Sequence, residues 1–158
     1  MDSVSTNNVF EALIGEAERR VGDDVDRVVR FEGTLSEAIV ANFAQGGTGN
    51  SIVFMTLSDA NPDTQSAYGT PIREGLLVDI SVVVRLGGRN RYQADIDRLC
   101  DVSDTIVHDL FENTLRSADA RKAYHGTQYV GRYRQPIGEG FISHLIRYVI
   151  TPARQVTT

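Results

Sequence analysis

The stretch "EGLLVDISVVVRLGGRN", residues 74–90, is the most regular part of the chain and decides the fold prediction. One side of it carries an apolar side chain at every second position: Leu76, Val78, Ile80, Val82 and Val84. The other side carries Leu77, Asp79, Ser81, Val83 and Arg85. A period of two residues predicts a long β-strand with one face on a helix-covered core and the other facing water or a partner. The charges of Asp79 and Arg85 on the second face raise the question of what they contact.

Length and composition predict one soluble globular domain. The chain has 158 residues, 41% of them hydrophobic, and no apolar run near the length needed to cross a bilayer. Its first residues, "MDSVSTNNVF", lack the basic start and apolar stretch of an export signal. The net charge is -5, and the 16 basic residues, of which only Lys122 is a lysine, form no cluster. We therefore expect no membrane attachment and no specific binding of nucleic acid.

Apolar stripes with a helical period predict three helices, over residues 8–21, 34–45 and 95–111. In the second helix, Thr34 and Glu37 have the spacing of a capping box, in which each side chain bonds the backbone of the other residue. The third helix has the most complete apolar stripe of the three. We expect it to lie on the sheet.

Short runs rich in β-branched residues predict the remaining strands. One strand spans residues 51–58, and two more lie within residues 126–154, the last of them over 141–150. Both faces of that last strand are largely apolar, which is typical of a central position in a sheet. Residues 25–31 fit either a continued helix or a short strand, and periodicity alone does not decide between them.

These elements predict a single α+β domain over residues 1–158, with a mostly antiparallel four-stranded sheet and helices packed on one face. The expected order is helix, helix, strand, strand, helix, strand, strand. The connection over residues 59–73 is longer than a usual hairpin loop and carries two prolines, so we expect it to be functional or flexible. The ends, at about residues 1–6 and 155–158, are also expected to be flexible.

A search for chemistry in the sequence predicts no enzyme, no metal site and no cofactor. The three histidines, His108, His125 and His144, have none of the spacings that place two metal ligands on one helical face. Cys100 lies in the middle of a predicted helix among apolar neighbours, which indicates a buried thiol without an adjacent base. The glycine-rich "GGTGNS", residues 46–51, lacks the Gly-Lys-Ser/Thr ending of a phosphate loop. A rival from another class is a small-ligand-binding domain, or a hydrolase that pairs Asp109 with a histidine.

The order of the segments resembles the tail terminator or tail-completion proteins of long-tailed bacteriophages. The likeness covers residues 8–154 and rests on the succession of "SIVFMTLS", "GLLVDISVVVR", "DIDRLCDVSDTIVHDLF" and "FISHLIRYVITPAR" after an N-terminal helix. The helical stretch over residues 34–45 departs from the shorter versions of that pattern. A head-completion or neck connector protein is the closest alternative, because it would share the same assembly logic.

The resemblance implies a virion protein, made in the host cytoplasm, that forms a ring of commonly six subunits on the end of the tail tube. Such a ring stops tube growth, contacts the tail tube protein and the head-tail connector proteins, and lets DNA pass through its lumen. Six copies with a charge of -5 each carry -30, which would keep the lumen from binding phosphate. We expect the subunit interface to use the outward face of the long strand, its preceding loop and the next strand after the third helix: Tyr68, Arg73, Asp79, Arg85, Arg132 and Arg134. These side chains are expected to serve association more than folding.

Overall fold

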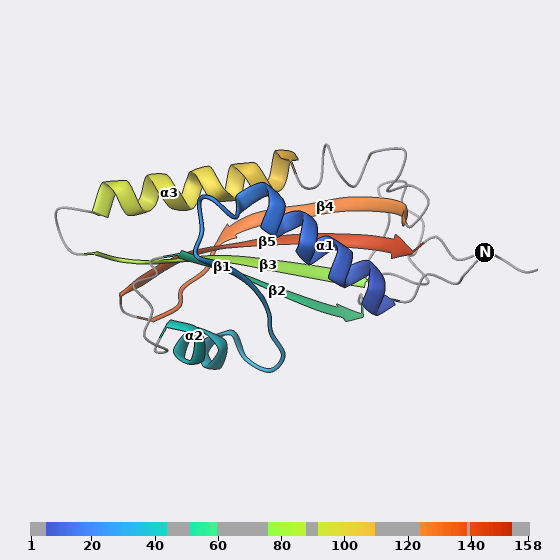
Figure 1. The fold of residues 1–158 in the computed structure, drawn as a ribbon, viewed down its shortest axis with the longest axis horizontal. Helices are drawn as coiled ribbons and strands as arrows, with labels where there is room; N and C mark the ends of the chain where they lie inside the picture. The colour runs from blue at the N-terminus through green and yellow to red at the C-terminus, as the bar shows by residue number, and fades with distance from the viewer. Residues whose placement is uncertain are drawn as a thin grey trace, which may run out of the picture.

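A computed structural model describes residues 6–43, 51–59, 76–87, 92–109, 124–138 and 140–152 (Figure 1). Within these ranges the chain forms a single α+β domain with three helices and five strands. Their bounds, in chain order, are α1 Thr6–Val21, β1 Arg27–Arg30, α2 Leu35–Phe43, β2 Ser51–Asp59, β3 Leu76–Arg85, α3 Tyr92–Thr105, β4 Tyr124–Arg134 and β5 Phe141–Pro152. The helices and strands predicted with clear periodicity are all present, with bounds that differ by a few residues at their ends.

The sheet has five strands in the order β1-β2-β3-β5-β4, so the predicted four-stranded sheet is one strand too small. The additional strand is β1, which lies in the stretch that periodicity left undecided and pairs parallel with β2. Glycine is required at position 22, directly after α1, since a Cβ there would lie 2.4 Å from the backbone oxygen of Glu18. The other pairings are antiparallel. The sheet is therefore mixed and mostly antiparallel, and β5 lies inside it, as its two apolar faces predict.

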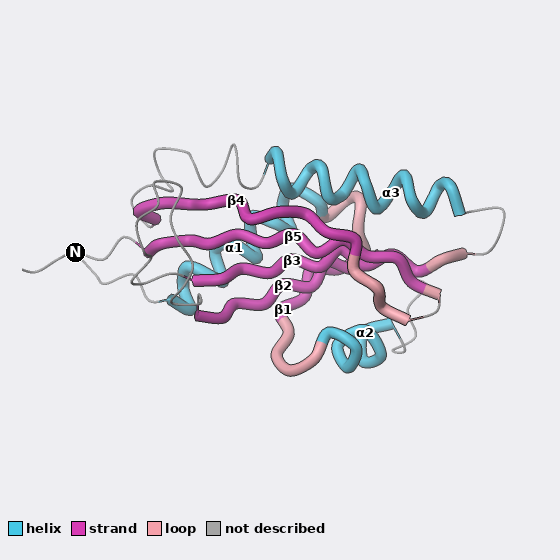
Figure 2. The backbone as a smooth tube through the Cα atoms, turned by 180° about the vertical axis from the view of Figure 1, so that it is seen from behind, coloured by secondary structure: helices cyan, strands magenta, loops and turns pink. Residues whose placement is uncertain are grey.

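The larger core lies between the sheet and two helices, α1 and α3 (Figures 1 and 2). The even-numbered apolar positions of β3 point into it, and Val78, Ile80, Val82 and Val84 are completely buried. From α1, Leu13 and Ala17 pack against this layer, and Leu99 does so from α3. The predicted alternation of apolar side chains along β3 is thus confirmed for the core-facing side of the strand.

The second helix, α2, packs on the opposite face of the sheet, so the prediction of helices on one face only is wrong. Its apolar stripe, which includes Ile39 and Phe43, forms a smaller core with Ile52, Phe54 and Val83. The backbone N–H of Glu37 donates to Thr34 Oγ1 at 3.3 Å, which confirms Thr34 as the N-cap. Because β1 and β2 are parallel neighbours, α2 is the crossover helix of a β-α-β unit, and it covers one end of this face.

Several predictions concern residues outside the described ranges. The long loop over residues 59–73 falls there apart from Asp59, which ends β2. The predicted flexible ends also fall there, except Thr6, the first residue of α1. No helix in the described part of the chain is long and apolar enough to span a membrane.

Candidate interaction surface

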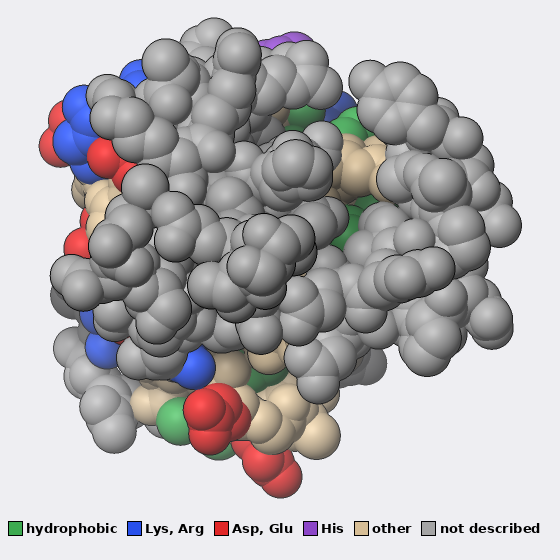
Figure 3. Space-filling view, turned by 90° about the vertical axis from the view of Figure 1, so that its right-hand side faces the viewer, with side chains coloured by type: hydrophobic (Ala, Val, Ile, Leu, Met, Phe, Trp, Pro, Cys, Tyr) green, Lys and Arg blue, Asp and Glu red, His purple; other side chains and the backbone are tan. Residues whose placement is uncertain are grey.

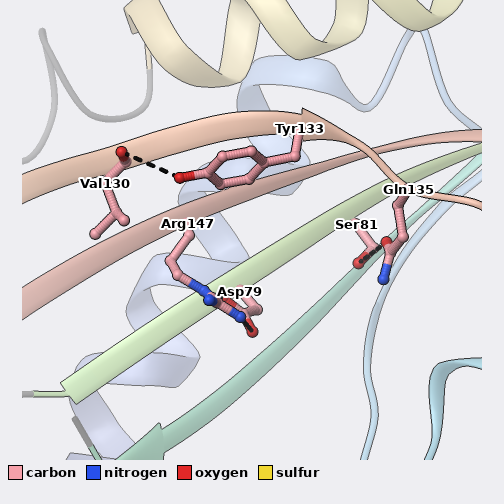
Figure 4. Close-up of polar contacts among 6 residues, drawn as sticks. All are labelled: Asp79, Ser81, Val130, Tyr133, Gln135 and Arg147. Atoms are coloured by element: carbon pink, nitrogen blue, oxygen red, sulfur yellow. Dashed lines mark hydrogen bonds and ion pairs between the residues drawn. The ribbon is translucent and has the colours of Figure 1, made fainter. Parts of the chain in front are cut away.

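The first predicted interface residue, Asp79, has its ion-pair partner in its own chain. The register of β3 and β5 sets Asp79 opposite Arg147, and the guanidinium of Arg147 donates to both carboxylate oxygens, at 2.8 and 3.0 Å (Figure 4). The hydrogen bond to Asp79 raises the pKa of Arg147. Figure 4 looks onto this face with α1 behind the sheet. The charge of Asp79 is therefore largely compensated within its own chain, by a residue that was not among the predicted interface residues.

The second predicted interface residue, Arg85, anchors α2 to the sheet. Its guanidinium donates to the backbone oxygen of Phe43 at 2.9 Å and lies 4.9 Å from the centroid of the Phe43 ring. The ring of Phe141, which packs on the Phe43 ring, is 5.9 Å from the same guanidinium. A second guanidinium, from Arg27, donates to the backbone oxygen of Asn42. Two cations thus bind the last carbonyl groups of α2, where the helix dipole is negative.

We expect Arg85→Ala to lower the free energy of unfolding by about 1.5 to 3 kcal/mol, because it removes a charged hydrogen bond and a cation–π contact from a half-buried position. This prediction differs from the expectation from the sequence, in which Arg85 serves association more than folding. Urea unfolding followed by circular dichroism measures the change. The matched control is Arg19→Ala on the exposed surface of α1, which should leave the unfolding midpoint unchanged. Equal midpoints for the two variants would contradict an anchoring role for Arg85.

The predicted residues Arg132 and Arg134 both lie on β4, which forms one edge of the sheet. Arg132 binds the carboxylate of Asp104 on α3, and that hydrogen bond raises the pKa of Arg132. The described residues offer no ion-pair partner to Arg134, which is exposed. Tyr68 and Arg73 lie outside the described residues. The four described members of the predicted set are therefore not brought together as one cluster.

Large exposed side chains gather on β4. Of the five exposed large hydrophobic residues in the described part of the chain, three lie on this strand: Tyr129, Val130 and Tyr133, which are 44%, 41% and 48% exposed. Among the described strands β4 pairs only with β5. We name the side chains of Tyr129, Val130, Arg132, Tyr133 and Arg134 the β4 edge. Tyrosine and arginine are enriched in protein–protein contacts, so the β4 edge is the best candidate interaction surface in the described chain.

The ring of Tyr133 lies over an irregular part of β4. The pairing with β5 is irregular between Tyr129 and Gly131. The Tyr133 ring lies along the strand so closely over Gly131 that a Cβ there would be 2.4 Å from the tyrosine oxygen. The Tyr133 hydroxyl reaches the backbone oxygen of Val130 at 3.5 Å, a long contact (Figure 4). A Cβ at position 131 would displace the ring, so this position of Tyr133 depends on the glycine.

A serine–histidine pair lies between α3 and the sheet. The hydroxyl of Ser103 and Nδ1 of His144 are 2.9 Å apart. Ser103 is completely buried, so its oxygen cannot meet a substrate in this structure. The pair satisfies two polar groups within the helix–sheet contact.

Burial lowers the pKa of His144, and the nearby positive charges of Arg132 and Arg134 lower it further, against a smaller opposite effect of Asp104. The folded protein therefore holds His144 neutral at pH values where the unfolded chain, with an ordinary pKa of about 6.5, already binds a proton. The free energy of unfolding should therefore be unaffected by His144 above about pH 6.5. It should fall as the pH drops from there toward the pKa of His144 in the folded protein.

Urea unfolding between about pH 7.5 and 5.5 measures this loss. We expect His144→Gln to flatten the pH dependence of the unfolding free energy. His108→Gln is the control, since His108 is exposed and should keep the dependence of the parent. The same slope in all three proteins would contradict the role given to His144.

The described residues contain no group of three or more His, Cys, Asp or Glu side chains that could hold a metal ion. Cys100 is half-buried on α3, so the prediction of a buried thiol is met only in part. In the view of Figure 3, acidic and basic side chains of the described residues lie next to one another at the left-hand margin, and no broad basic patch is visible among them. Such pairing is typical of an ordinary solvated surface.

Comparison with known proteins adds no relative. No family model matches the chain, and no curated protein matches it at a significant level.

Proposed function

We propose that this protein is a structural subunit that assembles with copies of itself into a ring at the head-proximal end of a bacteriophage tail tube. In that position it would end tube growth and offer the surface that joins the tail to the head. The β4 edge is the observation that carries the proposal, because it exposes two tyrosines and two arginines on a strand whose outer side has no described neighbour. The element order behind the resemblance, with α3 between two strand pairs, also supports it.

The physical role of the β4 edge follows from what its side chains contact. Tyr129 packs on Tyr148 at 5.1 Å between ring centroids, and Arg132 is held by Asp104, so both are oriented by their own chain. Tyr133 and Arg134 are also exposed and, as neighbours on the strand, extend from opposite faces of this sheet edge. A surface of oriented aromatic rings and guanidinium groups loses little side-chain entropy on association. It is therefore suited to repeated contacts between identical subunits.

Negative-stain electron microscopy of the purified protein tests the proposal. Closed rings are expected, and the same rings should cap the ends of tail tubes when they are mixed with the tube protein of the same phage. Uniform small particles without a central opening would count against it. Rings that bind the head connector but not the tail tube would favour a neck protein instead.

A further inference from the structure

A cavity of about 410 Å³ lies between the α1–β1 turn, the start of β2 and the first half of α3. Its lining is strongly acidic, with five carboxylates against one guanidinium: Asp23, Asp24, Asp26, Asp97 and Asp101 against Arg98. Asp26 accepts a hydrogen bond from the backbone N–H of Ser51 at 2.8 Å, and Asp97 accepts one from Gln93 at 2.9 Å. The side chains of Asp23 and Asp101 are exposed at its rim. The cavity therefore presents a net negative charge to an approaching molecule.

The cavity lies between residues 23–26 and α3, and α3 also reaches the β4 edge, because Asp104, one turn after the cavity residue Asp101, binds Arg132. Residues 23–26 lead directly into β1, which is the edge strand at the other end of the order β1-β2-β3-β5-β4. Each copy of the protein therefore carries a basic, aromatic surface at β4 and an acidic cavity whose part at residues 23–26 lies toward β1. When a second copy binds at the β4 edge, it still presents its own β4 edge, so contacts can repeat head to tail and close into a ring.

Backbone pairing of β4 with β1 of another copy is less favourable than contact through side chains. Irregularities in β4 at Tyr124/Gly126 and Tyr129/Gly131 disrupt the regular spacing that an added strand needs. Both strands also expose arginines, Arg27 and Arg30 on β1 and Arg132 and Arg134 on β4. Like charges facing each other across a strand pair are destabilising. Contact through side chains, with opposite charges, is the better solution.

The geometry points to a contact in which the β4 edge of one copy, led by Arg134, inserts into the acidic cavity of a second copy. This inference rests on the proposed function and names the surfaces that would join the subunits of the ring. The second copy is the occupant that the charges favour, because the one exposed guanidinium of the β4 edge without a described partner has its complement in that cavity. The chain thus carries both halves of the contact.

Charge reversal on each surface tests the contact. Arg134→Glu and Asp23→Arg should each weaken self-association by about a hundredfold or more, because each places like charges across the contact. An equimolar mixture of the two variants should regain association, since the reversed pair is attractive again. Arg19→Glu on the exposed surface of α1 is the matched control and should associate as the parent does. Sedimentation equilibrium measures association, and circular dichroism verifies that every variant is folded.

The outcomes separate this inference from the function that it rests on. If the parent forms rings and both reversed variants form them equally well, the contact is wrong while the ring proposal stands. If each variant is weakened but the mixture does not recover, the contact is also wrong, because the two charges then act on different partners. A parent that stays monomeric at high concentration overturns both.

Discussion

Replacing Val82 by aspartate is expected to abolish the folded state, whereas the same replacement at Val40 should leave it almost unchanged. Val82 is completely buried in the larger core, at the centre of β3. An unpaired carboxylate there costs about 3 to 5 kcal/mol, which is a large part of the 5 to 15 kcal/mol that stabilises a typical domain. Val40 is 68% exposed on α2, where a surface substitution changes stability by about 0.5 kcal/mol or less.

Far-UV circular dichroism and urea unfolding distinguish the two variants. Val82→Asp should lose most of its ordered signal at room temperature, or unfold at a much lower urea concentration than the parent. Val40→Asp should have the midpoint of the parent. If Val82→Asp unfolds at the same urea concentration as Val40→Asp, the assignment of the even-numbered face of β3 to the core is incorrect.

Tyr133→Ala is expected to weaken association strongly without loss of fold, and Tyr92→Ala is its matched control. Both tyrosines are 48% exposed, so the two variants remove similar side chains with equal solvent exposure. Tyr133 is held on the β4 edge over Gly131, whereas Tyr92 is the first residue of α3. Aromatic anchors at the centre of an interface typically contribute about 2 kcal/mol or more, which is about a thirtyfold change in the dissociation constant.

Sedimentation equilibrium over a range of concentrations measures this difference. The melting temperatures of the two variants should stay close to that of the parent, since the in-chain contact of the Tyr133 hydroxyl is long, at 3.5 Å. Should Tyr92→Ala weaken association as much as Tyr133→Ala, or neither have an effect, the β4 edge is not the contact surface.

Local periodicity was enough to predict most of the fold. The alternation in β3 and the apolar stripes of α1 and α3 are signals within single segments, and each element lies where its pattern places it. The fifth strand, β1, could not be predicted, because four residues with the pattern Arg-Val-Val-Arg satisfy both helix and strand. Its identity depends on pairing with β2, which is a contact between distant parts of the chain.

The side of the sheet that α2 occupies follows from that missing strand. An apolar stripe shows that a helix packs on something, but it does not specify which face. Parallel β-α-β units nearly always have the same hand, so the position of α2 depends on β1 being the parallel neighbour of β2. Without β1, the helix over residues 34–45 was predicted to pack on the same face of the sheet as the other two helices.

The candidate surface was less predictable than the fold. The outward direction of Asp79 and Arg85 follows from alternation, but their in-chain partners do not, since Arg147 is 68 positions away from Asp79 and meets it only through the β3–β5 register. The tyrosines of β4 were missed because the irregularity at Tyr129/Gly131 breaks the alternation of "YVGRYR". The available signal was composition, since the segment "YVGRYR" contains two tyrosines and two arginines around one glycine.

Native mass spectrometry of the purified protein tests most directly the claim that this chain is a ring-forming subunit. The proposal predicts a closed oligomer, and six copies of a 17.4 kDa chain give a particle of about 104 kDa. Its abundance should fall in Tyr133→Ala and persist in Tyr92→Ala. A single species of 17.4 kDa at every concentration, from the parent as well as from the variants, would contradict the account.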